Sequence, residues 1–260
     1  MNLDDSQRAS QAQFDRQSQR YGRSHVLADV SDLDATVEGI DLPVGGLALD
    51  VATGGGHTAL WLARRGYRVT LADISQQMLD RAAELLDEEG FLPETRQHAA
   101  EELPYSGRSF QIVTCRVAAH HFSDPAAFVR EAARVLAPGG FLIVVDGTAP
   151  DDRPEAEAWL HEVEKFRDPS HGRFLRPAVW RQLCASAGLD VRRCEVRRRK
   201  QPDLEWYFET AATSPVNRER VRKLVANASR PVREYYSLAE EDGRITWQWP
   251  MIHLVAAKPS

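Results

Sequence analysis

The chain has 260 residues, of which 43% are hydrophobic and 27% are charged, and its formal net charge is −5. This composition is typical of a globular protein and excludes a disordered or fibrous chain. No stretch approaches the roughly 18 consecutive apolar residues of a membrane span, and the polar N-terminal segment has no apolar signal core. Mild acidity argues against general affinity for nucleic acid. Three scattered cysteines indicate neither a disulfide framework nor a metal site, so we expect a cytoplasmic protein that binds no metal.

Strand and helix patterns alternate regularly from about Leu42 to Asp146. The strand-like segments are residues 47–51, 67–71, 110–115 and 141–145. Ser75 and Asp124 are typical N-caps for the helices that follow them, and Pro138–Gly140 predicts a turn. Strands that alternate with helices at these lengths predict a mostly parallel sheet with helices on both faces, which is an α/β fold.

Beyond Asp146 the pattern is looser. It predicts helices at 154–166 and 177–187, a strand at 190–199, a helix-rich stretch at 205–228 and a last strand at 245–257. Aromatic residues crowd the stretch that precedes the last strand, and they predict either an aromatic lid or ordinary helix packing: Trp206, Tyr207, Phe208, Tyr235 and Tyr236. Trp247 and Trp249 alternate on the last strand and are expected in the core.

The segment from Asp50 to Ala59 carries the most information. It leads from the first strand into a helix through Thr53-Gly54-Gly55-Gly56. Glycine has no Cβ, so a ligand can lie against the backbone where the helix begins. Asp73 ends the second strand, where a carboxylate can accept both hydroxyls of an adenosine ribose. Together these features favour a nucleoside site over a plain strand–helix turn.

Two classes of nucleoside cofactor fit the glycine spacing. Gly54, Gly56 and Ala59 satisfy the G-x-G-x-x-A fingerprint of dinucleotide enzymes. Asp50, however, stands four residues before the first glycine, and its charge would repel a pyrophosphate but attract an ammonium group. S-adenosylmethionine carries an amino group and a sulfonium but no phosphate. The negative charge of Asp50 therefore favours S-adenosylmethionine over a dinucleotide.

Four segments of the sequence resemble class I S-adenosylmethionine-dependent methyltransferases, in the branch related to ubiquinone and menaquinone biosynthesis. They are Leu49–Ala59, Glu101–Tyr105, Thr114–Phe122 and Ala133–Gly140. The resemblance implies a single domain with a Rossmann-like seven-stranded sheet, mostly parallel, whose last strand is antiparallel. It also implies an N-terminal cap (1–40), a cofactor-binding core (42–147) and two substrate-side helical insertions (148–176 and 201–243) that form a lid.

The same resemblance implies which residues contact S-adenosylmethionine. They are Tyr21, Asp50, Ala52, Thr53, Gly54, Gly56, Asp73, Ile74, Ala100, Glu101 and Arg116. Asp50 is expected at the methionine amino group, Asp73 at the ribose and Ile74 at the adenine. Ala99 stands where the family often has an acidic residue near the adenine. Arg116 has three open roles: binding the cofactor carboxylate, binding an acidic substrate, or pairing with a carboxylate of the protein.

Methyl transfer is an in-line displacement that needs a base only when the acceptor must lose a proton. His121, which follows the strand at 110–115, is a candidate base, although structural packing of this ring with a hydrogen bond to a loop backbone is the favoured interpretation. Asp168 and His171, in the segment after the strand at 141–145, form a second candidate pair over the substrate. Alternatively, Asp168-Pro169-Ser170 is a turn closed by an Asx-type hydrogen bond.

The single basic run, Arg192–Lys200, fits an edge strand whose charges prevent edge-to-edge pairing better than it fits RNA binding. We therefore expect an enzyme that methylates a small molecule, with nucleic acid an improbable partner and the oligomeric state open. A nicotinamide-dependent oxidoreductase and a non-catalytic S-adenosylmethionine-binding protein are the alternatives.

Overall fold

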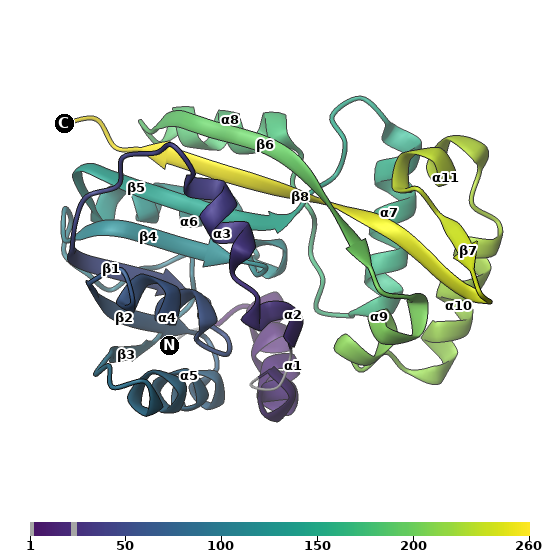
Figure 1. Cartoon of the computed structure of the whole chain (residues 1–260), viewed down its shortest axis with the longest axis horizontal. Coiled ribbons are helices and arrows are strands. Elements are labelled where there is room, and N and C mark those ends of the chain that lie inside the picture. Colours follow the sequence, from purple (N-terminus) through teal and green to yellow (C-terminus); the bar gives the residue numbers. More distant parts are fainter. Residues whose placement is uncertain (1–2, 22–24) are drawn as a thin grey trace.

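The computed structural model describes residues 3–21 and 25–260, without the side chains of residues 17–21, 25 and 26. Tyr21, a predicted cofactor contact, ends helix α1, and its side chain lies outside the described residues. A twisted sheet occupies one side of the molecule and a group of helices the other, and two long strands run from one to the other (Figure 1). None of the described helices is long and apolar enough to cross a membrane.

The described residues form eight strands. They are β1 (Gly46–Val51), β2 (Tyr67–Asp73), β3 (Glu94–Gln97), β4 (Phe110–Arg116), β5 (Leu136–Gly147), β6 (Asp190–Gln201), β7 (Ala239–Glu241) and β8 (Arg244–Ala257). The main sheet has the order β3-β2-β1-β4-β5-β8-β6. The first five strands are parallel, and β8 runs antiparallel to both of its neighbours, β5 and β6. This confirms the predicted α/β fold with a mostly parallel seven-stranded sheet and an antiparallel last strand, to which the short β7 adds a hairpin.

Helices cover both faces of this sheet. They are α1 (Asp5–Tyr21), α2 (His25–Ala28), α3 (Ser31–Val37), α4 (His57–Ala63), α5 (Gln76–Glu88), α6 (Pro125–Val135), α7 (Pro154–Arg167), α8 (Pro177–Ser186), α9 (Leu204–Thr210), α10 (Pro215–Ala226) and α11 (Arg230–Tyr236). Ala48 and Leu71 pack with α4 and α5 on one face. Leu49 and Val113 pack with α6 and α8 on the other. Alternate residues of buried parallel strands thus serve opposite faces of one core.

Helices α7, α9, α10 and α11 gather at the end of the molecule to which β6 and β8 extend (Figure 1). Trp247 and Trp249 of β8 are buried there beside Tyr207 of α9, which confirms that both tryptophans belong to the core. Helix α11 and strand β7 follow α10 and had no counterpart among the predicted elements.

The predicted helix N-caps are present in the structure, and the predicted turn at Pro138–Gly140 is not. The predicted N-caps are confirmed, because Ser75 Oγ accepts from Met78 N at 3.2 Å and Asp124 Oδ1 accepts from Ala127 N at 2.9 Å. The predicted turn at Pro138–Gly140 is wrong. These residues are an irregular stretch inside β5, and backbone hydrogen bonds to Lys258 at 2.9 and 2.8 Å keep them in the sheet.

Strand β6 is the sheet edge, as its charge pattern predicted. Arg193 donates to the carbonyls of Ala35, Thr36 and Glu38 at the end of α3, and Lys200 pairs with Glu241 at 2.8 Å. The basic run therefore protects and anchors an edge strand.

Candidate active site

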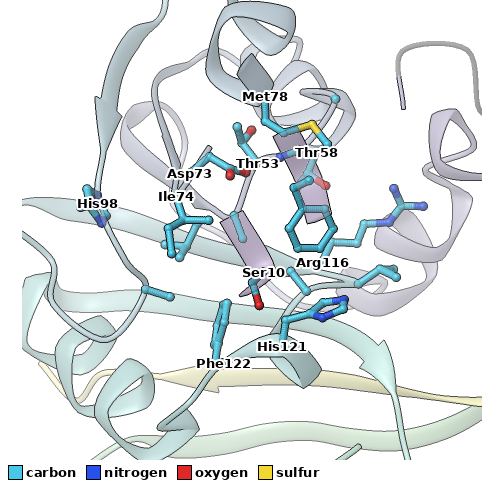
Figure 2. A pocket seen from close by; sticks show the side chains of 18 of the residues that line it. Ser10, Thr53, Thr58, Asp73, Ile74, Met78, His98, Arg116, His121 and Phe122 are labelled. Carbon is cyan, nitrogen blue, oxygen red and sulfur yellow. Dashed lines mark hydrogen bonds between the residues drawn. The ribbon is translucent and has the colours of Figure 1, made fainter. Parts of the chain in front are cut away.

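The described residues form a cavity at the carboxyl ends of β1, β2 and β4, where open α/β sheets bind ligands. Figure 2 shows Thr53 and Asp73 on one wall and His121 and Phe122 across the cavity from them, with Ser10 between. Helix α1, the loop after β1 and the segment after β4 thus enclose one site.

The loop after β1 is held in an unusual conformation. Ala52 has a φ of 54°, which is uncommon for a residue with a side chain. Thr53 N donates to Ala72 O at 3.0 Å and fixes the loop against β2. Gly54 lines the cavity. Gly56 instead faces α5, where an added Cβ would lie 2.9 Å from both the Cα and the Cβ of Ala82. The structure therefore gives Gly56 a packing role rather than a place in the cavity wall.

Asp73 ends β2 and lines the cavity, as predicted. Its Oδ1 accepts from Ser75 N at 2.9 Å and its Oδ2 accepts from Gly54 N at 3.0 Å. Burial raises the pKa of this carboxyl to about 6, although the backbone donors oppose the shift. Ile74 also lines the cavity. The carboxylate is thus oriented before any ligand arrives.

Asp50 lies behind the loop instead of in the cavity lining, and its side chain is buried. Its Oδ2 accepts from Thr53 Oγ1 and its Oδ1 accepts from Thr114 Oγ1, each at 2.6 Å. Burial raises the pKa of Asp50 to about 6, against these two hydrogen bonds. The expected direct contact of Asp50 with a ligand amino group is not supported by this position, because Thr53 separates the carboxylate from the cavity.

Glu101 and Ala100 lie at another part of the lining. Glu101 links two segments, since its Oε2 accepts from Gln7 of α1 at 2.9 Å and its Oε1 accepts from Ser123 N at 2.8 Å. His98 lines the same region, although the sequence pointed to Ala99. Its Nε2 accepts from the Tyr105 hydroxyl at 2.9 Å, and burial lowers the pKa of its ring.

Arg116 ends β4 and contributes to the cavity wall, but its guanidinium is occupied by the N-terminal segment. It donates to Asp32 Oδ2 at 2.9 Å, to Leu27 O at 2.8 Å and to Asp29 O at 2.5 Å. Of the three predicted roles, the structure shows pairing with a carboxylate of the protein. Arg116 thereby fastens the segment between α2 and α3 to the sheet.

Helix α1 covers the cavity. Gln11 Nε2 donates to Ile74 O at 2.9 Å, and Asp15 accepts from Ser75 Oγ at 2.5 Å. Ser10 lines the cavity, and its buried hydroxyl has no hydrogen-bond partner in the described part of the chain. Phe14 packs edge-on against His121, with ring centroids 5.0 Å apart.

His121 ends the 3₁₀ helix η1 (Ala119–His121) and lines the cavity. Its Nδ1 lies 3.1 Å from the carbonyl oxygen of Ser170, which can only accept, so Nδ1 carries a proton and the lone pair is on Nε2. Burial, with His120 beside it, lowers the pKa of His121 to about 4. The ring is therefore neutral at pH 7, and the same burial makes it a weak base in the free protein.

Ser170 links Asp168 to His121, whereas Asp168 and His171 share a backbone hydrogen bond (His171 N to Asp168 O, 2.9 Å) but none between their side chains. Ser170 Oγ lies 3.2 Å from His121 Nδ1 and donates to Asp168 Oδ1 at 2.6 Å, while Ser170 N donates to the same oxygen at 2.9 Å. The predicted Asp168–His171 pair is wrong, and the alternative Asx-type turn is confirmed. Burial acts to raise the pKa of Asp168, but His121, Ser170 and Arg167 outweigh it and lower this pKa. His171 lies outside the cavity lining, and neither of its ring nitrogens has a hydrogen-bond partner among the described residues.

Sequence reasoning missed several lining residues. They include Ser10, Phe14, Met78, His98 and Phe122. Ser10 and Phe14 share one face of α1 with Gln7 at helical spacing, but that face is too polar to produce an apolar stripe.

Comparisons with known proteins identify the family and the fold of this chain. A family model described as "Methyltransferase domain" matches residues 49–144. The uncharacterized methyltransferase YcgJ of Bacillus subtilis is 34% identical over 171 residues, which cover 65% of this chain and 67% of that protein. The chain belongs to the S-adenosylmethionine-dependent methyltransferases.

Other comparisons agree with this assignment. The crystal structure of a candidate methyltransferase from Bacillus halodurans superposes with a TM-score of 0.83 at 31% identity, covering 88% of this chain and all (100%) of that one. The ubiquinone biosynthesis O-methyltransferase of Caulobacter is 38% identical over 104 residues, 39% of this chain and 41% of that enzyme. The predicted family and its cofactor, S-adenosylmethionine, are confirmed, and the oxidoreductase alternative is set aside. Among the described residues, no three His, Cys, Asp or Glu side chains are grouped so as to hold a metal ion.

Proposed function

We propose that this methyltransferase transfers the methyl group of S-adenosylmethionine to a small-molecule acceptor that loses a proton to His121. The observation that carries the proposal is the cavity at the ends of β1, β2 and β4, where oriented polar groups on one wall face His121 on the other. S-adenosylmethionine supplies an electrophilic methyl group on a positively charged sulfur.

The cavity lining fits the donor from the ribose to the methionine end. Asp73 accepts hydrogen bonds from the ribose hydroxyls, while its contacts with Gly54 N and Ser75 N keep the carboxylate oriented. Ile74 and Ala100 provide apolar surface for the adenine. Gly54 presents backbone to the methionine part, and Ser10 contributes a buried hydroxyl without a protein partner. Satisfying that hydroxyl is favourable because a buried unpaired polar group costs free energy.

Asp50, Ala52, Gly56 and Arg116 shape the donor site indirectly. The Asp50 carboxylate holds the Thr53 hydroxyl, and Ala52 keeps the left-handed backbone that turns the loop. Gly56 lets α4 approach α5, and Arg116 keeps the N-terminal segment over the cavity. Helix α1 thereby excludes water, which strengthens the electrostatic interactions inside the site.

His121 takes up the proton that the acceptor releases. The lone pair of Nε2 receives it, while Nδ1–H stays on the Ser170 carbonyl. The imidazolium that forms is stabilised by Asp168 through the Ser170 hydroxyl. The charge lost by sulfur as the methyl group leaves thus reappears on a ring that has a carboxylate behind it.

The three cysteines are buried and free, which accords with a reducing, cytoplasmic setting.

Titration calorimetry with S-adenosylhomocysteine tests the donor site. Wild-type protein should bind it, and Asp73→Ala should weaken binding at least tenfold, since a carboxylate hydrogen bond contributes about 1.5–3 kcal/mol. Asp80→Ala, an exposed carboxylate of α5, is the matched control and should bind like wild type. Absence of binding in the wild type would refute the proposal. Labelled-methyl transfer to a panel of acceptors then separates the enzyme from a non-catalytic binding protein, for which no product would form.

A further inference from the structure

Beyond the donor cavity, seven side chains of the described residues have buried polar atoms without a hydrogen-bond partner, and four of these side chains lie in one region. The unpaired atoms of these four are both ring nitrogens of His171, Oε1 of Glu164, the hydroxyl of Tyr207 and Nε1 of Trp249. All four residues are at most 8% exposed. Native proteins rarely leave buried polar atoms unpaired, so five of them in one place call for an explanation.

The four side chains belong to one cluster, although they come from α7, the turn after it, α9 and β8. The Phe174 ring lies 4.7 Å from His171 and 5.6 Å from Trp249, measured between centroids. Tyr207 lies 5.6 Å from Trp249. Arg167 connects the remaining member, with its guanidinium 4.0 Å from the Tyr207 centroid and 3.0 Å from Glu164 Oε2.

This cluster adjoins the donor cavity through histidine rings. His120 lies 5.4 Å from His171 and 4.1 Å from His121, again between centroids, and His121 lines the cavity. A molecule held by the cluster is therefore on the side of His121 away from the glycine loop. An acceptor anchored in the cluster must therefore extend past His120 into the cavity, so that its reacting group lies between the donor methyl group and His121.

The unpaired atoms offer both donors and acceptors. Trp249 can only donate, Tyr207 can do both, and burial lowers the pKa of His171, so its neutral ring donates from one nitrogen and accepts at the other. Aromatic rings supply the surrounding surface. Arg167, the cation that touches the cluster, already donates to Glu164, to the Tyr207 carbonyl and to Thr210, so its guanidinium has little capacity left to bind an anion.

We propose that Glu164, His171, Tyr207 and Trp249 form the acceptor subsite and that it takes an uncharged aromatic molecule with hydrogen-bonding groups on more than one edge. This proposal rests on the proposed methyl-transfer function. His171 is then a binding residue, and His121 remains the base.

Catechol, with benzoate as its anionic counterpart, tests the subsite by calorimetry on the full chain saturated with S-adenosylhomocysteine. Catechol should bind and benzoate should bind at least tenfold more weakly. Tyr207→Phe and Glu164→Gln should each weaken catechol binding about threefold to tenfold, as expected for one lost hydrogen bond. Because S-adenosylhomocysteine binding is measured first, its failure refutes the proposed function, whereas its success without catechol binding refutes only the subsite.

Thermal denaturation distinguishes a binding role from a structural one. Tyr207→Phe removes an unpaired hydroxyl, so the melting temperature of the free protein should stay the same or rise. Tyr236→Phe is the matched control in the same helical group, because the buried Tyr236 hydroxyl donates to Ala156 O at 2.9 Å. That control should lower the melting temperature and leave catechol binding unchanged. A lower melting temperature for Tyr207→Phe together with unchanged catechol affinity would overturn the proposal.

Discussion

The donor cavity and the cluster around His171 differ in how their polar groups are satisfied. Around the donor cavity, Asp50, Asp73 and Arg116 all have short hydrogen bonds to the protein itself. In the cluster, both nitrogens of His171 and the Tyr207 hydroxyl have no hydrogen-bond partner among the described residues. Except for the Ser10 hydroxyl, the polar groups named at the donor cavity are held by the chain itself, whereas the cluster keeps several hydrogen-bonding atoms that a bound molecule can satisfy.

This contrast indicates that the donor part and the acceptor part of a transferase site can recognise their ligands in different ways. A donor shared by a whole family can be met by a loop whose shape is fixed in advance, which lowers the entropic cost of binding. An acceptor is recognised by groups that are costly to bury unpaired, so a molecule lacking the right partners is rejected. Each variant described below alters one of the two regions and leaves the other intact.

The largest effect is expected at His121, where the two regions meet. His121→Gln keeps a polar side chain but removes the base, so kcat on the acceptor found in the labelled-methyl screen should fall about 10²- to 10³-fold. S-adenosylhomocysteine affinity should stay within about twofold of wild type. His253→Gln, a buried histidine that contacts Thr36 at 2.6 Å, is the control. A kcat within threefold of wild type for His121→Gln would leave this ring without a catalytic role.

Gly56→Ala tests the packing of the loop after β1 in the donor region. The new Cβ would meet Ala82 at 2.9 Å, and the φ of +85° is unfavourable for alanine. Together these should lower the free energy of unfolding by about 3 kcal/mol. Gly90→Ala separates the two causes, because Gly90 has a φ of +82° but nothing within 4 Å, so we expect a loss of only about 1 kcal/mol. Equal losses in urea denaturation would show that contact with α5 is unimportant.

Arg116→Lys tests the anchor of the N-terminal segment. Lysine cannot reproduce the planar contacts with Asp32, Leu27 O and Asp29 O, so the segment should open more easily, by about 1–2 kcal/mol. Limited proteolysis between residues 27 and 32 should be about tenfold faster, with S-adenosylhomocysteine restoring protection. Arg64→Lys, an exposed partner of Glu89, should cleave at the wild-type rate. Unchanged proteolysis of Arg116→Lys would mean that other contacts hold the segment.

The smallest predicted effect is a pH dependence of donor binding. Burial raises the pKa of Asp73 to about 6, above the unfolded value near 4, so the folded protein binds an extra proton between about pH 4 and pH 6. The stability of the free protein therefore falls as the pH rises from about 4 to 6, and above pH 6 Asp73 is the carboxylate that the ribose needs. S-adenosylhomocysteine affinity should therefore increase severalfold from pH 5 to pH 7. Asp73→Asn should abolish this increase, and persistence of the increase in that variant would assign it to another group.

The donor half could be predicted from the sequence because its signals are local. Ser75 and Asp124 cap helices through bonds that span three residues, and the glycine loop lies within one short segment. Asp73 follows from the end of the next strand. The charge of Asp50 alone does not reveal that each of its oxygens accepts from a threonine hydroxyl, of Thr53 and of Thr114.

The acceptor half could not be predicted because it is assembled across long separations. Glu164, Tyr207 and Trp249 come together only when β8 returns beside β5, and each is ordinary in its own segment. Trp249 was expected in the core and lies there, but its unpaired Nε1 becomes evident only in three dimensions. Likewise, the Asp168–His171 pair was plausible in sequence, whereas Ser170 connects Asp168 to His121 instead.

A crystal structure of the protein with S-adenosylhomocysteine is the most direct test of the donor assignment. We expect the ribose hydroxyls on Asp73, the adenine against Ile74, and the Asp50 carboxylate still on Thr53 and Thr114 without touching the ligand. A nucleoside bound elsewhere, or one whose ribose makes no contact with Asp73, would contradict the account.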